Sequence, residues 1–228
     1  MIAAVHQPQF LPWLGYFDKM MRADTFCYLD NVQFKKNEFQ NRNRIKTSNG
    51  WQWITVPVLH RFTQKINEVE INNTVKWRRK HLRSLVANYG KTPFFRTCIP
   101  FFEHLYSEEW KTLSELNIMV IEHFRKILGM EQKPVVQAST LDLSDEPTDR
   151  LIDICESLGA DTYLAGEGAG AYMNFKRFEK RGIRLAVQRF HHPEYPQIKG
   201  PFLSNMSIVD LLFNCGPGGM KNTVTSWI

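Results

Sequence analysis

Side chains that can carry chemistry follow two short apolar runs near the start of the chain. Residues 2–5 end directly on His6 and Gln7, and residues 25–29 end on Asp30. A histidine at the end of a strand can act as a base or as a donor to an anion. No second ligand stands at a suitable spacing, so a metal site is not expected. We therefore predict that His6 is a general base and that Gln7 and Asp30 contact the substrate.

The elements that position these residues form one unit. A stretch with helical periodicity, at about residues 14–21, lies between the two apolar runs. Strand, turn, helix and strand in this order make the βαβ unit of a parallel sheet. Ligands bind at the carboxyl ends of the strands in open parallel sheets. The sequence therefore predicts a pocket at the edge where His6 and Asp30 lie.

The turn before this helix adds Trp13, Gly15 and Tyr16. Glycine would let a backbone or a ligand approach closely, and helix amino termini favour anions. The ring of Trp13 or Tyr16 would stack on a sugar or a base. The alternative interpretation is that these residues only shape a tight turn over the core.

A group of amide, guanidinium and ammonium donors follows the second apolar run. It consists of Asn41, Arg42, Asn43, Arg44 and Lys46, with Gln33 shortly before it. Such donors suit the recognition of phosphate or carboxylate groups. We expect this segment to hold the anionic part of a ligand beside the first βαβ unit. A surface turn with solvated arginines is the competing interpretation.

Two later loops complete the candidate site. The segment GEGAG, which begins at Gly166, follows a predicted strand and would hold a phosphate or a sugar, although it matches neither a P-loop nor GxGxxG. The loop after the last predicted strand carries His191, His192, Tyr195 and Gln197. In a parallel sheet this loop falls at the same edge as His6, so we expect His191 to serve in acid–base catalysis and Tyr195 in binding. A glycine turn and a proline-braced surface loop are the alternatives.

The remaining chain continues the alternation of strands and helices. Strands are expected over 51–58, 65–71, 134–138, 161–165 and 183–190. Helices are expected over 75–88, 93–106, 108–128, 145–158, 172–181 and 207–214. The pattern predicts a single α/β domain over 1–228 with a mostly parallel sheet and a helical insert at about 75–130.

Composition limits the class of partner. The net charge is +6, and residues 1–91 hold 15 Lys/Arg against 6 Asp/Glu, so this part would steer an anionic ligand. No basic run is long enough for a nucleic-acid tail, and no apolar run is long enough to span a membrane. The four cysteines are far apart and no signal peptide is evident, which predicts reduced core thiols in a cytoplasmic protein. Neither a metal nor an organic cofactor is expected.

Long motifs carry a resemblance to a known family. They include HQPQFLPWLGYFDKM, ADTFCYLDNVQFKK, NRNRIK, TYLAGEGAGAYM and FHHPEYPQIKGPFLSNMSIVDLLFN. At these motifs the chain resembles the WbqC-like family of bacterial proteins over nearly its whole length. The family is similar to proteins encoded in O-antigen and other surface-polysaccharide loci. This resemblance implies a setting of activated sugars, often amino sugars that carry acyl or aminoacyl groups.

A second resemblance concerns the order of parts. Nucleotidylyltransferases of the HUP type also run strand, HxGH turn, helix and strand. The sequence from Trp13 to Tyr16 falls at the place of HxGH, keeps the glycine and lacks both histidines. The resemblance implies a Rossmann- or HUP-like sheet that keeps the pocket and loses histidine-assisted nucleotidyl transfer.

The first function that we infer is an acyl- or aminoacyltransferase acting on a nucleotide-linked amino sugar. The acyl donor is unidentified and is either free or bound to a carrier. His6 or His191 would accept the proton of the attacking amine, and Arg42, Arg44 and Lys46 would hold phosphates. A HUP-type nucleotidyltransferase relative and a non-catalytic nucleotide-sugar-binding protein are the alternatives.

Overall fold

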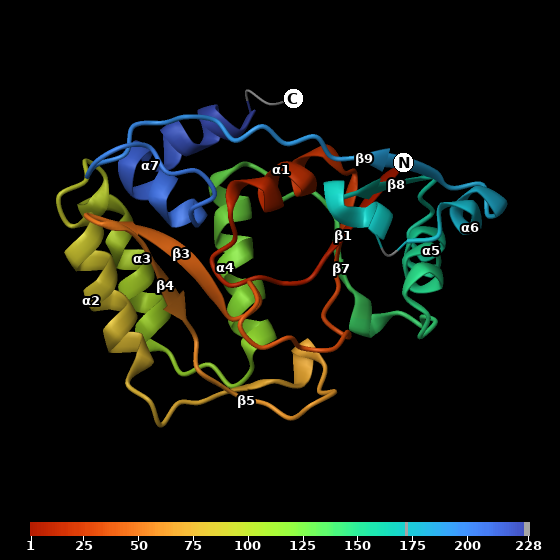
Figure 1. Ribbon diagram of the computed structural model, residues 1–228, viewed down its shortest axis with the longest axis horizontal. Helices are drawn as coiled ribbons and strands as arrows, with labels where there is room; N and C mark the ends of the chain where they lie inside the picture. The colour runs from red at the N-terminus through yellow and green to blue at the C-terminus, as the bar shows by residue number, and fades with distance from the viewer. Residues whose placement is uncertain (172, 226–228) are drawn as a thin grey trace.

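Five parallel strands form the central sheet of the computed structural model, which describes residues 1–171 and 173–225 (Figure 1). The strands are β1 (Ile2–His6), β2 (Thr25–Tyr28), β7 (Val135–Gln137), β8 (Thr162–Ala165) and β9 (Arg184–Val187). Their spatial order is β7-β2-β1-β8-β9. Numbered along the chain, this is the order 3-2-1-4-5 of Rossmann-like sheets. The prediction of an α/β fold with a parallel sheet is confirmed.

The first strand lies in the middle of the sheet. It pairs with β2 on one side, where His6 lies opposite Tyr28, and with β8 on the other, where Ile2 lies opposite Thr162. Helices cover both faces, so the central residues of β1 are small and apolar and are fully or almost fully buried. The strand order reverses between β1 and β8. This topological switch point is where open α/β sheets bind their ligands.

Two apolar clusters cover the two faces of the sheet. One contains α1 (Leu14–Arg22), α4 (Leu113–Ile127) and α7 (Ile208–Thr225), and its aromatic core includes Phe17 and Phe124 with ring centroids 5.8 Å apart. The other contains α5 (Pro147–Ser157) and α6 (Phe175–Lys180), with Phe178 stacked on Tyr163. Figure 1 shows α5 and α6 on one side of β1 and β8, and α4 and α7 on the other.

The helices differ from the predicted ones mainly at their ends. In the stretch 75–130 the structure has α2 (Trp77–Tyr89), α3 (Phe95–Ser107) and α4. The fourth helix begins later than predicted because Thr112 and Glu115 form a reciprocal capping box. The last helix extends past the predicted 207–214, with a break at Gly216, where φ is 71°. The predicted helix 172–181 is seen as α6, and Tyr172 lies outside the described residues.

The strands predicted over 51–58 and 65–71 are not part of the central sheet. Instead, β3 (Arg42–Thr47) and β4 (Gly50–Thr55) form an antiparallel hairpin, and β5 (Val58–Leu59) pairs with β6 (Glu70–Ile71). The prediction of a strand over 65–71 holds only for Glu70–Ile71, because a 3-10 turn, Ile66–Glu68, occupies most of the segment. Ile66 and Val69 are both fully buried, and their spacing of three suits a turn and not a strand.

Candidate functional site

His6 stands at the carboxyl end of β1, beside the switch point. Its Nδ1 lies 3.0 Å from the Gln7 carbonyl oxygen, which can only accept, so Nδ1 carries the proton and Nε2 keeps a lone pair. Its ring packs against Tyr16 with centroids 4.7 Å apart. Burial and the charge of Lys19 lower the pKa of His6 to about 4. The imidazole is therefore neutral at pH 7 and can accept a proton at Nε2.

Lys19 is a buried residue of this site that the sequence analysis missed. Its ammonium donates to the Val5 carbonyl of β1 at 2.9 Å and lies 5.8 Å from the ring centroid of Tyr163 on β8. It therefore sits at the junction of the two strands that flank the switch point. Burial lowers its pKa to about 8. No carboxylate forms an ion pair with it in the part of the chain that the structure describes, so its charge is not compensated by an acidic side chain there.

Amide side chains fix the loop that follows His6. The Gln7 side-chain oxygen accepts from Gln40 at 2.8 Å, and Gln40 in turn accepts from the backbone N–H of Lys35. Asn117 of α4 donates to the carbonyl oxygens of Pro8 and Gln40 at 3.0 and 2.8 Å. The loop after β1 is thus tied both to the segment before β3 and to α4.

Aromatic rings close the turn before α1 and the first turn of this helix. A Cβ atom added to Gly15 would lie 2.3 Å from the Trp13 ring, so the indole leaves no room for a ligand on that side. Tyr16 is almost fully buried, and its hydroxyl has no hydrogen-bond partner among the described residues. Trp13 also meets Phe190 edge to face at 5.2 Å. The two positions that correspond to the histidines of HxGH are therefore occupied by packed rings.

Replacing Gly15 by alanine should lower the free energy of unfolding by about 1–3 kcal/mol, because the new methyl group overlaps the Trp13 ring. Urea denaturation followed by circular dichroism measures the change. Gly166→Ala is the matched control, since a Cβ atom there meets nothing within 4 Å. Equal losses in the two variants would contradict the packing described for Trp13.

Asp30 lies at the carboxyl end of β2, on the wall of a cavity of about 410 Å³. Its carboxylate accepts from the backbone N–H of Ser139 at 2.9 Å and from the Ser139 hydroxyl at 2.7 Å. The remaining polar lining consists of Asn67, Ser114, Glu115 and Gln137, and Ile118 and Met119 are the apolar part. The Asn67 side-chain oxygen is buried and has no partner among the described residues. The cavity is therefore rich in acceptors and suits a ligand with hydroxyl or amine donors.

The segment 41–46 does not form the single donor cluster that we expected. It is a strand, whose alternation sends neighbouring side chains to opposite faces. Asn43 is fully buried and donates to the carbonyl oxygens of Phe10 and Leu11. Asn41 is also buried and bonds to the Val56 carbonyl oxygen.

The arginines of this strand lie on the open face of the hairpin. The guanidinium of Arg42 lies 4.0 Å from the ring centroid of Trp53, and that of Arg44 lies 5.3 Å from Trp51. Gln33 is exposed, and its backbone bridges to Lys65.

Lys46 belongs to a buried network centred on Asp210. Asp210 is fully buried and accepts from the hydroxyls of Tyr89 and Tyr195, both at 2.9 Å, and from Gln197 at 2.7 Å. Lys46 donates to Gln197 at 2.8 Å. Burial raises the pKa of Asp210. Tyr195 and Gln197 therefore point into this network, whereas His191 is exposed, so the predicted cluster on their loop is divided.

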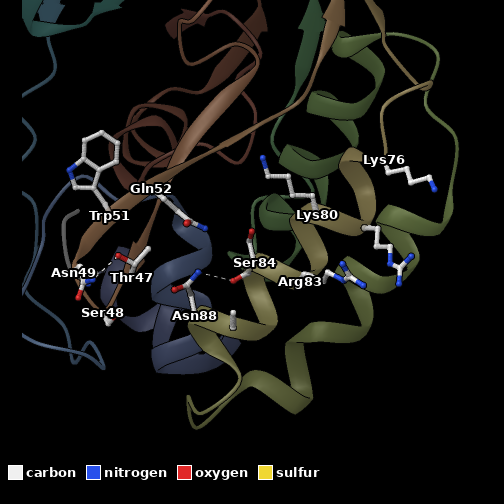
Figure 2. A pocket seen from close by; sticks show the side chains of 12 residues that line it. Thr47, Ser48, Asn49, Trp51, Gln52, Lys76, Lys80, Arg83, Ser84 and Asn88 are labelled. Carbon is white, nitrogen blue, oxygen red and sulfur yellow. Dashed lines mark hydrogen bonds between the residues drawn. The ribbon is translucent and has the colours of Figure 1, made fainter.

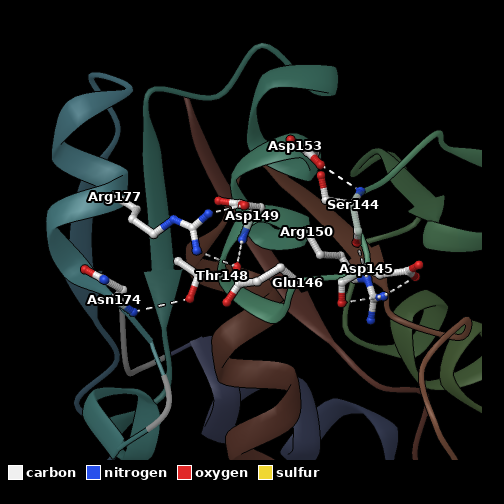
Figure 3. A network of polar contacts seen from close by, with 9 residues as sticks. All are labelled: Ser144, Asp145, Glu146, Thr148, Asp149, Arg150, Asp153, Asn174 and Arg177. Atoms are coloured by element: carbon white, nitrogen blue, oxygen red, sulfur yellow. Dashed lines mark hydrogen bonds and ion pairs between the residues drawn. The ribbon is translucent and has the colours of Figure 1, made fainter.

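The loop that begins at Gly166 follows β8 on the other side of the switch point. The space beside Gly166 and Gly168 is open, because a Cβ atom added to either glycine would have no other atom within 4 Å. Figure 3 shows the polar network that holds the flanking helices, in which Arg177 of α6 pairs with Glu146 and Asp149 at the start of α5. These ion pairs fix the far end of the loop and leave its first turn open.

The described residues contain neither a metal-binding cluster nor a membrane-spanning helix. Within residues 1–171 and 173–225, no three His, Cys, Asp or Glu side chains are grouped to hold a metal ion. None of the helices described there has both the length and the apolar character that crossing a bilayer requires.

Comparison with known proteins identifies the family of the chain. The sequence model of the WbqC-like protein family matches residues 7–222. The chain belongs to the WbqC-like family. A relative in Mycobacterium tuberculosis, the uncharacterized protein Rv1507c, is 37% identical over 217 residues, which are 93% of each chain. No solved structure matched.

Signals for the missed residues of this WbqC-like protein were present in the sequence. Lys19 lies in the apolar helix stretch LGYFDKMM, where a charged side chain has little access to water. Ser139 follows the predicted strand 134–138, so the strand-end argument used for His6 applies equally to it. Asn67 and Glu115 come from segments outside the central sheet, and no local pattern brings them to its edge.

Proposed function

We propose that this WbqC-like protein is a transferase that attaches an acyl or aminoacyl group to the amine of a nucleotide-linked amino sugar. The observation that carries the proposal is the acceptor-lined cavity at Asp30, on the strand next to His6. In this proposal the enzyme works in the cytoplasm on precursors of a surface polysaccharide, and the acyl donor is free or carrier-bound.

The polar lining of the cavity at Asp30 suits a sugar that carries an amine. Hydroxyl and ammonium groups donate hydrogen bonds, and the oxygens of Asp30, Glu115 and Asn67 accept them. Ile118 and Met119 provide apolar contacts for the C–H groups of the ring. Its volume of about 410 Å³ is within the range of small-molecule sites.

His6 supports the proton transfer. The amine nitrogen forms a bond to the acyl carbon, its proton passes to Nε2 of His6, and the acyl–leaving-group bond then breaks. The imidazolium returns the proton to the leaving group, so the enzyme is regenerated. A pKa of about 4 keeps Nε2 unprotonated at neutral pH and makes the imidazolium a strong acid toward the leaving group.

The nucleotide part is assigned to the switch point. Lys19 would compensate part of the diphosphate charge, and the open turn at Gly166 would accept close approach of the ligand. The strand order supports this assignment, because ligands of such sheets lie where the order reverses.

The test is a direct assay for the amide product. The protein is incubated with a UDP-linked amino sugar and either acetyl-CoA or an aminoacyl thioester, and products are analysed by mass spectrometry. The proposal predicts a product whose mass exceeds that of the sugar nucleotide by the mass of the acyl group minus the mass of one hydrogen atom. Ligands retained by the purified protein are identified in the same way and guide the choice of sugar.

The same experiment separates the alternatives. Retained or bound nucleotide sugar with no amide from any donor would favour the non-catalytic binding protein. Nucleotidyl transfer is disfavoured, because Trp13 and Tyr16 stand where HxGH enzymes have histidines.

A further inference from the structure

A second and larger cavity lies away from the carboxyl edge of the sheet. It is an open groove of about 740 Å³ between the β3–β4 hairpin and α2. Figure 2 shows the hairpin on one side and α2 on the other, with Gln52, Ser84 and Asn88 between them. Its lining shares no residue with the cavity at Asp30.

The groove carries uncompensated positive charge. Its lining contains Lys76, Arg79, Lys80 and Arg83, and no Asp or Glu. None of the four forms an ion pair with a carboxylate in the described part of the chain. The neighbouring Arg78 does form an ion pair, because its guanidinium lies 4.0 Å from the carboxylate of Glu109. The groove is therefore suited to an anionic ligand.

The spacing of the lining indicates an extended ligand. Lys76, Lys80, Ser84 and Asn88 recur every fourth residue and form one ridge along α2. At the helical rise this ridge is about 18 Å long. The four cations are exposed and lie between Lys76 and Arg83, over about 10 Å at the start of the ridge, whereas a compact phosphate requires donors that converge on one point. We therefore expect the ligand to be a chain molecule that carries several anionic groups along its length.

The neutral lining indicates a sugar. Trp51 belongs to the lining at the hairpin edge of the groove, its side chain is 44% exposed with Arg44 beside it, and exposed aromatic rings pack on the C–H face of a pyranose. Asn49, Gln52 and Asn88 offer amide donors and acceptors for hydroxyl groups. A nucleic acid strand would need a stacking surface for successive bases, and Trp51 is the one aromatic side chain in this lining.

We propose that the groove between the β3–β4 hairpin and α2 binds an acidic oligosaccharide, with carboxylates on the four cations and one ring on Trp51. This site is separate from the proposed transferase site and does not depend on its activity.

The test measures binding of hexagalacturonate by calorimetry at low ionic strength, with maltohexaose as the uncharged hexasaccharide. The acidic chain should bind at least about tenfold more tightly, and added salt should weaken it. The double variant Lys80→Glu, Arg83→Glu should bind at least about tenfold more weakly, and Trp51→Ala should also lose affinity. The double variant Lys176→Glu, Lys180→Glu, at two exposed positions on α6, makes the same change in charge and should bind as the unchanged protein does.

Three results would overturn the proposal. They are no binding of hexagalacturonate, equal effects of the groove and control variants, or tighter binding of oligothymidylate than of the uronate. The last would mark the groove as a nucleic-acid surface. Circular dichroism of each variant verifies that the fold is intact, so that a loss of binding reports on the groove.

Discussion

Replacing His6 by alanine should lower turnover about 10²–10⁴-fold and leave the affinity for the nucleotide sugar nearly unchanged, if the proposed transferase reaction is correct. This is the usual contribution of a general base, and it acts on the chemical step. The rate of amide formation is measured under saturating substrate, and affinity is measured separately by calorimetry.

His6→Gln decides between proton transfer and a structural role. Glutamine keeps a hydrogen-bonding group but takes no proton at neutral pH. Equal losses in the alanine and glutamine variants would support proton transfer at Nε2. Full recovery by glutamine would instead assign His6 to binding or to the shape of the turn before Pro8.

The pH dependence offers a second measure of His6. Because the pKa of His6 is lowered to about 4, its Nε2 stays unprotonated as pH falls from 7 to near 4. On the acid side of the profile, kcat/KM should therefore decrease around pH 4, where His6 becomes protonated, and not around the ordinary histidine pKa of 6.5. An acid limb centred near 6.5 would contradict the neutral state assigned to the half-buried imidazole of His6.

Replacing Asp210 by alanine should lower the free energy of unfolding by about 3–5 kcal/mol. The change removes the acceptor of Tyr89, Tyr195 and Gln197 and leaves the buried Lys46 without the nearby negative charge. Urea denaturation measures the loss, and Glu131→Ala, at an exposed position, is the control.

A double variant refines this prediction. If the unpaired Lys46 charge contributes to the cost, Asp210→Ala combined with Lys46→Met should be more stable than Asp210→Ala alone. Additive losses would show that the ammonium is stabilised by Gln197 and Pro201 without Asp210. A loss below about 1 kcal/mol for the single variant would contradict a structural role for the network.

Local periodicity predicted the five strands of the central sheet and most of the helices, and the βαβ unit predicted that the first two strands belong to one parallel sheet, but the order of the remaining strands was not predicted. The continuous apolar runs at residues 2–5 and 25–29 indicate buried strands, because both faces of a parallel sheet are covered by helices. The order of the strands depends on contacts such as Ile2 with Thr162, which no window of sequence contains. The strand predicted over 51–58 pairs with β3 in a hairpin outside the central sheet, and this was not predicted because an isolated strand pattern does not identify its partner.

The placement of the candidate site residues was predicted in part. The strand-end rule found His6 and Asp30, which the structure places on adjacent strands at one edge. The types of residue in the segment NRNRIK predict a set of donors, but its period of two indicates a strand with asparagines on one face and arginines on the other. Lys19 was missed because α1 was treated only as a positioning element.

The pairing of β1 with β8 also bears on how the protein folds. The partners Ile2 and Thr162 are separated by most of the chain, and closing so long a loop costs entropy before any contact offsets it. During synthesis, β1 can meet β2 soon after both leave the ribosome, whereas its other edge stays open until β8 has emerged. The switch point is therefore assembled late, and until then β1 presents an unpaired edge to which a chaperone, or a second nascent chain, can bind.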